Sequence, residues 1–322
     1  DMRMGLMAAV AGAVVGVTGG LAMGEGNAAL SYYRAWSVMD RDLQLGLISD
    51  DDAFRLSDDG AQRLSASQGT VEDLLRAASS GDADWGIAYE DGPLALLPHL
   101  GSMRASARVL GADVLRCVEA GDHAGAAARI AALYRMSEDV SGDRNLISSL
   151  VGMAIGNEAN KLARHCLDRG VLDSEDAEVV LNAIHEMTAA DRFGMRDSIV
   201  GEWRMIAEFL LSRAPEEGAG AWLLETLQID ADDERTKRIA GMDRSALMGE
   251  MGGWSMFFSD VLAAWDGEDR AQLTSVVERL KGDSYGALPY VIAPSVSRAI
   301  ESSRQSAEDF DRLIERLEGI AD

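Results

Sequence analysis

The fold is decided by one stretch in the middle of the chain, residues 144–169, which reads RNLISSLVGMAIGNEANKLARHCLDR. Its apolar residues return every three or four positions, which is the period of one helix face; they are Ile147, Leu150, Val151, Ile155, Leu162 and Cys166. The polar residues Asn157, Asn160, Lys161 and Arg164 fall on the opposite side. Gly170 follows, and glycine commonly ends a helix because it adopts a left-handed backbone without strain. The stretch therefore predicts an amphipathic helix.

Small residues form a strip along the same stretch, at Gly152, Gly156, Ala159 and Ala163. Where side chains are this small, a second helix can approach closely. We expect the strip to pack against a neighbouring helix of the same chain rather than to form a seam between two copies.

The helical period continues over most of the chain after residue 90. We expect further helices at 94–117, 124–136, 175–187, 195–213, 245–265, 271–280, 287–302 and 307–317. Pro93 is placed to open the first of them, and Pro98 to kink it or reset its start. No run of alternating apolar and polar residues predicts a strand. The expected fold class is all-α, built from antiparallel helical hairpins with no substantial sheet.

Composition divides the chain into five expected segments. Residues 25–92 form an irregular, acidic and partly helical region, and 93–214 a helical-hairpin core. The acidic stretch 215–241 is interpreted as a linker to a C-terminal helical lobe, 242–322.

The first segment, residues 1–24, is expected to be a signal peptide or an N-terminal anchor. An uncharged run, 4–23, follows Arg3, and Ala22-Met23-Gly24 places small residues just before Glu25, as a signal peptidase requires. The run is also long enough to span a bilayer. We therefore expect an exported protein of the periplasm or cell envelope, with tethering to the membrane by residues 4–23 as the alternative.

The charge of the chain bears on its partners. The sequence has 54 acidic and 30 basic residues, a formal charge of −24. Such a field repels nucleic acid and anionic lipid. We expect no nucleic-acid partner, and membrane contact only through an uncleaved N-terminal segment.

Two cysteines are present, Cys117 and Cys166. In an oxidising compartment, cysteines on neighbouring helices can form a disulfide. The alternative interpretation is two small buried apolar side chains.

Residues 114–133 resemble the middle of a tetratricopeptide repeat. A Gly121-Asp122 turn joins two helices there, with small residues at Ala120, Ala127 and Ala132. The resemblance implies a helical hairpin and TPR-like stacking. Two other strings, 27–36 and 91–100, resemble segments of uncharacterised exported bacterial helical proteins, a resemblance that implies no activity, cofactor or substrate.

Residue patterns typical of metal or nucleotide binding are not found. The four histidines stand singly, and the sequence has no Ser-x-x-Lys pair or glycine-rich phosphate loop. We expect no metal or other cofactor.

Aromatic residues near the C-terminus, Trp254, Phe257 and Phe258, are spaced along one helical face. Core packing is the first interpretation, and a groove for a peptide or apolar ligand is the second.

Two hypotheses on function follow. The first is a non-enzymatic helical scaffold or binding protein that engages a protein or peptide partner through a concave groove. The second is an envelope hydrolase or lyase with carboxylates in a helical cleft, around Glu158, His165 and Glu202.

Overall fold

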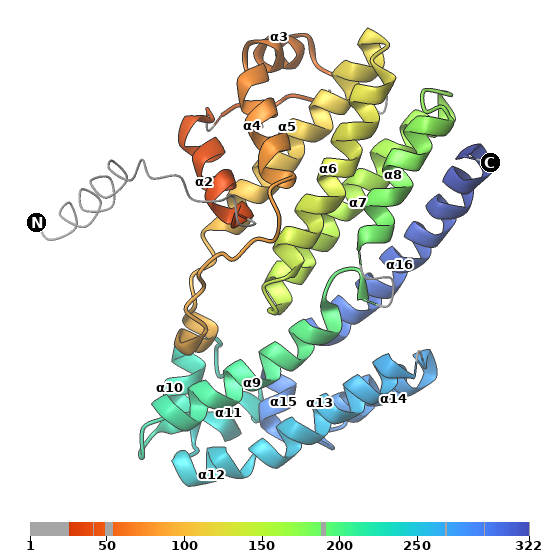
Figure 1. The fold of residues 1–322 in the computed structure, drawn as a ribbon. Helices are drawn as coiled ribbons and strands as arrows, with labels where there is room; N and C mark the ends of the chain where they lie inside the picture. The colour runs from red at the N-terminus through yellow and green to blue at the C-terminus, as the bar shows by residue number, and fades with distance from the viewer. Residues whose placement is uncertain are drawn as a thin grey trace, which may run out of the picture.

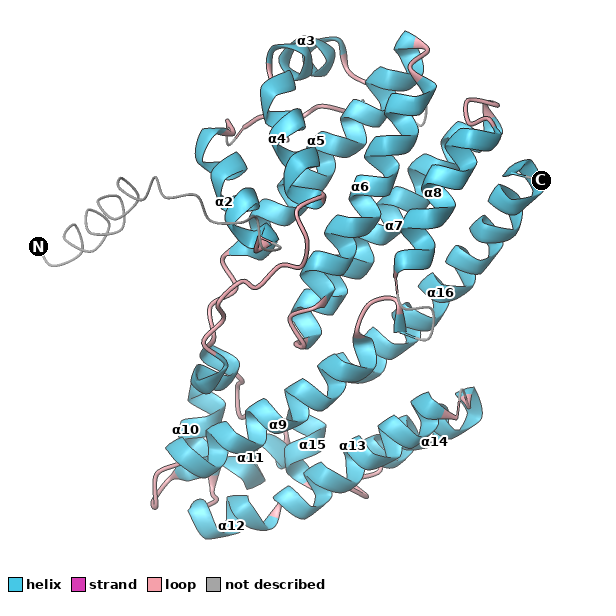
Figure 2. Ribbon diagram, viewed as in Figure 1, coloured by secondary structure: helices cyan, strands magenta, loops and turns pink. Residues whose placement is uncertain are grey.

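A computed structural model describes residues 26–40, 42–48, 54–187, 191–267, 269–292 and 294–321. Within these ranges the chain forms fifteen α-helices, one 3₁₀ helix and an isolated bridge between Ile48 and Leu56, and no strand (Figures 1 and 2). The predicted all-α fold class is confirmed. The expected signal peptide or anchor, 1–24, lies outside the described residues.

The helices form two lobes, each with its own apolar core. The first lobe contains α2 (Ala28–Val38), α3 (Asp58–Ala66), α4 (Gln68–Ala78), α5 (His99–Ala120), α6 (His123–Ser141), α7 (Leu146–Asp168) and α8 (Ser174–Glu186). Consecutive helices from α5 to α8 run antiparallel, and α6 packs against α4, α5, α7 and α8 (Figure 1). The hairpin predicted around Gly121 is present, whereas TPR-like stacking remains a prediction.

Helices α6 and α7 pack closely against each other, and the small-residue strip permits this close packing. The Ser137 hydroxyl donates a 2.7 Å hydrogen bond to the carbonyl of Gly152. A Cβ at position 152 would lie 2.0 Å from the Ser141 Oγ, so only glycine fits there.

One residue of α7 departs from the expected polar face. Asn160 is fully buried and accepts a 2.7 Å hydrogen bond from the Tyr134 hydroxyl. Because α7 packs against α5, α6, α9 and α16, the core covers more of its circumference than an amphipathic surface helix allows.

Helix boundaries follow local chemistry. Asn145 caps α7 by accepting the Ser148 N–H, and Gly170, at φ +64°, follows its end as predicted. Asp173 caps α8, where its side chain accepts the Asp176 N–H. The long helix expected from Pro93 begins only at His99, because Pro93 belongs to the 3₁₀ helix η1 (Tyr89–Leu94) and the chain restarts after Pro98.

The second lobe contains α9 (Met195–Arg213), α10 (Ala219–Thr226), α11 (Glu234–Ala240), α12 (Arg244–Gly249), α13 (Met251–Asp266), α14 (Arg270–Lys281), α15 (Ala287–Ile292) and the start of α16 (Pro294–Ala321). Its core includes Leu146 of α7 and several residues of α9, all within the segment expected to end at residue 214. The expected linker 215–241 holds α10 and α11, whose Leu223 and Ile239 are buried. These two helices were not predicted, because the stretch is acidic and each helix is short and buries few residues.

Helix α16 and the segment 79–98 both contact the two lobes. Helix α16 places Ile300 in the second core and Phe310 in the first. The strap, residues 79–98, runs from α4 to α9 and back to α5 (Figure 1). In it, Gly92 packs on the Phe209 ring and the Tyr89 hydroxyl donates to the carbonyl of Asp143. Among the described helices, none has the length and apolar character needed to cross a bilayer.

Candidate functional site

A pocket of about 660 Å³ opens in the first lobe where the C-terminal parts of α4, α6 and α8 meet the strap. Its volume lies in the range of small-molecule and side-chain binding sites. We call it the acidic pocket. It is lined by Ala78, Ser79, Gly81, Asp82, Ala83, Arg135, Glu138, Asp139, Gly142 and Glu186.

Negative charge dominates this pocket. Its four carboxylates belong to Asp82, Glu138, Asp139 and Glu186, and its one cation is Arg135. The Arg135 Nε lies 3.3 Å from a carboxylate oxygen of Glu186, so this guanidinium already has a partner. A partly enclosed pocket lined by charges of one sign focuses the electrostatic field, and a negative lining favours cationic ligands.

Asp139 is the most perturbed of these carboxyls. Burial raises its pKa to about 7, the Tyr32 hydrogen bond opposes the rise, and the neighbouring Glu138 and Asp82 add to it. The Tyr32 hydroxyl donates that hydrogen bond at 2.7 Å. The pKa of Glu138 is raised as well, by burial and then by Glu186 and Asp82. Near neutral pH the pocket therefore contains a carboxyl that readily gains or loses a proton.

Aromatic rings support the wall behind Asp139. The Trp85 indole N–H donates a hydrogen bond of 3.0 Å to the carbonyl of Asp139. The Trp85 ring stacks on Trp36 at 5.7 Å between centroids and on His99 at 4.4 Å. Tyr32 packs against both tryptophans. This packing fixes α2 and the strap against α6, and with them the position of the Tyr32 hydroxyl.

A buried polar network lies beneath the rings. The His99 Nε2 is 2.8 Å from an Asp143 carboxylate oxygen, and the Ser148 hydroxyl donates to the same oxygen at 2.9 Å. The Asn145 amide donates to the Ser148 hydroxyl at 2.9 Å. Because Ser148 is bonded to the carboxylate and not to the imidazole, this is not the order of a nucleophilic triad. The network joins the end of α6 to the start of α7 and to α5.

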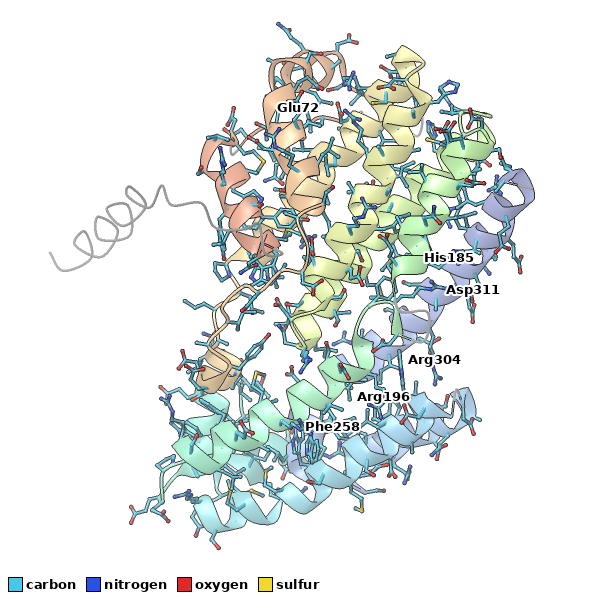
Figure 3. The ribbon with its side chains drawn as sticks, in the orientation of Figure 1. Glu72, His185, Arg196, Phe258, Arg304 and Asp311 are labelled. Carbon is cyan, nitrogen blue, oxygen red and sulfur yellow. The ribbon has the colours of Figure 1, made fainter. Side chains whose placement is uncertain are left out.

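The aromatic residues proposed as a groove lie elsewhere. Trp254, Phe257 and Phe258 are each at most 1% exposed, inside the second lobe, where Figure 3 labels Phe258. The Trp254 and Phe258 rings meet edge to face at 4.5 Å, and Phe257 and Phe258 at 5.2 Å. In this structure they are core residues and present no groove surface.

Cys117 and Cys166 are buried as free thiols. Burial raises the pKa of Cys117 to about 11 and that of Cys166 to about 12. Both thiols are therefore protonated and unreactive near neutral pH. The disulfide stays a prediction.

The carboxylates and histidine proposed for an enzymatic cleft do not share a pocket. Glu158 pairs with Lys161 at 3.5 Å, and His165, two turns further along α7, meets the Phe54 ring edge. Glu202 is on α9, where burial raises its pKa and it accepts the N–H of Leu146 at the start of α7. Leu146 and Glu158 are about 18 Å apart along the helix at 1.5 Å per residue.

The residues of the acidic pocket were missed because the expected helix stopped at Met136, whereas α6 continues to Ser141. In a chain of 54 acidic residues, Glu138-Asp139 does not stand out. Had the predicted helix been extended beyond Met136, it would have placed Arg135 and the pair Glu138-Asp139 on one helix, and this was the signal available in the sequence.

No group of three His, Cys, Asp or Glu side chains in the described part of the chain is arranged to hold a metal ion. Comparison with known proteins finds no match to a family model, to a curated protein or to a solved structure.

Proposed function

We propose that the protein is a binding protein that takes a basic segment of a peptide or protein partner into the acidic pocket. The observation that carries this proposal is the excess of carboxylates over cations in a pocket of about 660 Å³. Lysine ammonium and arginine guanidinium groups are the side chains that satisfy clustered carboxylates. The expected export of the chain would place such a partner in the cell envelope.

Asp139 makes binding sensitive to pH. A cation beside this carboxyl stabilises its ionised form, so a bound lysine lowers the pKa of Asp139 from about 7. Binding near pH 6 then releases a proton, and affinity rises as the pH increases through 7 while lysine stays charged.

A neighbouring hollow extends the surface beyond one side chain. It has a volume of about 720 Å³, lies between α2 and α4, and shares Ser79 with the acidic pocket. Arg34 and Arg76 line it, the latter paired with Asp73. A short extended peptide could therefore place a basic residue in the acidic pocket and a carboxylate near Arg34.

The test is calorimetric titration with an acetylated tetralysine amide at two ionic strengths. Glu138→Gln combined with Glu186→Gln should weaken binding by about tenfold or more. The matched control removes the same charge from the exposed face of α16, as Glu315→Gln with Glu318→Gln, and should change the Kd by less than about twofold. Equal losses in both double variants would mean unspecific attraction by net charge and would refute the proposal.

A hydrolase or lyase is the second candidate function, favoured by one observation. A carboxyl with a pKa of about 7, such as Asp139, can act as a general acid near neutrality. Under this hypothesis Asp139→Asn abolishes turnover of a polymeric envelope substrate, whereas binding survives. Screening envelope polysaccharides and peptides for cleavage separates the two functions.

A further inference from the structure

A second pocket, of about 400 Å³, lies between the loop 42–48, α5 and α7. It shares no lining residue with the acidic pocket or with the hollow beside it. We call it the arginine pocket. The residues that matter for its chemistry are Gln44, Leu47, Arg104, Arg108, Ile155 and Glu158.

Two arginines provide its cationic side. Arg104 and Arg108 are one turn apart on α5, so their side chains project from the same face about 6 Å apart. Within the described residues, the Arg104 guanidinium forms no hydrogen bond or ion pair, and Arg108 donates to a neutral amide, the Gln44 Oε1, at 2.8 Å. No carboxylate in the described part of the chain neutralises either guanidinium. This pair suits the carboxylate of a ligand, which arginine binds through two parallel hydrogen bonds.

The floor and the opposite side differ in chemistry. Leu47 and Ile155 are buried beneath the opening and form an apolar floor. Glu158 follows Ile155 by one turn on α7, so it borders the same pocket, and its nearest cation is Lys161 at 3.5 Å. The pocket thus combines guanidinium groups, apolar side chains and one carboxylate, a set complementary to a carboxylate, an apolar body and an ammonium group.

The loop wall of this pocket is fixed in advance. Arg63 donates to the carbonyls of Asp42 and Leu45. The Ser57 hydroxyl donates to Gly46 at 2.6 Å, and its N–H donates to the carbonyl of Leu47 at 2.9 Å. A wall that is already ordered loses little conformational entropy when a small ligand binds.

We infer that the arginine pocket binds a free α-amino acid with an apolar side chain. The α-carboxylate lies against Arg104 and Arg108, the ammonium group faces Glu158, and the side chain covers Leu47 and Ile155. The volume of about 400 Å³ is at the lower end for ligand sites and suits one amino acid better than an extended peptide. This inference does not rest on the proposed binding of basic segments.

The test is calorimetric titration of the full chain with L-leucine and two analogues. The analogue 4-methylpentanoate keeps only the carboxylate, and 3-methylbutylamine keeps only the amine. L-leucine should bind saturably, and each analogue should bind at least about tenfold more weakly. Arg104→Gln combined with Arg108→Gln should weaken leucine binding by about tenfold or more, whereas Arg204→Gln, at an exposed arginine of α9, should leave it within about twofold.

Three results would overturn the inference. One is the absence of saturable binding by leucine, valine, methionine or phenylalanine up to about 10 mM, which lies above the Kd of even weak ligands. Another is equal affinity for leucine and 4-methylpentanoate, which would make the pocket a general carboxylate site. The third uses the unaltered chain: methyl NMR shifts on adding leucine that miss Leu47 and Ile155 would place the ligand elsewhere. Glu138→Gln with Glu186→Gln should leave leucine binding unchanged, which separates this site from the acidic pocket.

Discussion

Tyr32 of α2 and Asp139 of α6 are 107 positions apart in the sequence, and the tyrosine hydroxyl donates a 2.7 Å hydrogen bond to the aspartate. A hydrogen bond to the ionised form of a carboxyl lowers its pKa. Tyr32 therefore sets how readily the acidic pocket changes charge near neutral pH.

Tyr32→Phe should raise the pKa of Asp139 above its value of about 7, because the ionised carboxylate loses its donor while burial continues. Carboxyl ¹³C chemical shifts recorded against pH measure the change. Tyr285→Phe removes a similar 2.7 Å hydrogen bond, to Asp260 in the second lobe, and should leave the Asp139 titration in place. An Asp139 titration that is unchanged in Tyr32→Phe would show that the Tyr32 hydrogen bond does not lower the pKa of Asp139.

Asp139 should also make stability depend on pH. Its folded-state pKa of about 7 exceeds the unfolded value of about 3.9, so the native state binds more protons between these pH values. The resulting stabilisation is fully present below pH 4 and is lost as the pH rises through 7. Allowing for partial exposure, the loss is on the order of 2 kcal/mol. In urea unfolding from pH 4 to 8, the free energy of unfolding should decline more steeply for the unaltered chain than for Asp139→Asn. Parallel declines in the two proteins would exclude this contribution of Asp139.

His99→Ala should lower the free energy of unfolding by about 3 kcal/mol, since it leaves the buried Asp143 carboxylate without its imidazole partner and removes the ring stacked on Trp85. Urea unfolding monitored by tryptophan fluorescence measures this loss. His185→Ala, at an exposed position on α8 (Figure 3), should change stability by less than about 0.5 kcal/mol. Similar effects at both positions would argue against a structural role for the His99 network.

Gly152→Ala should destabilise the fold by about 1–3 kcal/mol, because the added Cβ would meet the Ser141 Oγ and the Ser137 carbonyl and push α6 from α7. Gly101→Ala is the control, in the first turns of α5 with no atom near the added Cβ, and should stabilise the helix by about 0.5–1 kcal/mol. Thermal unfolding followed by circular dichroism distinguishes the two. A Gly152→Ala variant as stable as the unaltered chain would mean that the helices are less closely packed.

Helix identity was predictable because the apolar period is local, and α7 and α9 were expected close to their actual bounds. The contacts that a helix makes with neighbouring helices were not predictable from the local pattern. Asn160 was expected on the polar face, yet Tyr134 provides a buried partner from α6. Pro93 lies in η1, beside Gly92, which packs against Phe209 of the other lobe, and a local pattern carries no sign of that contact.

The acidic pocket was unpredictable for a related reason. Asp82 comes from the strap, Glu138 and Asp139 from α6, and Glu186 from α8. Each is one acidic residue among many, and only the packing of these segments makes them neighbours. Glu158 was proposed as functional from its sequence, but its pocket neighbours are Arg104 and Arg108 rather than His165 and Glu202.

Helix α16 contributes Ile300 to one core and Phe310 to the other. The helices that α16 packs against, α7, α8, α9 and α15, precede it in the chain, so a nascent chain exposes the apolar surface that α16 buries until α16 has been synthesised.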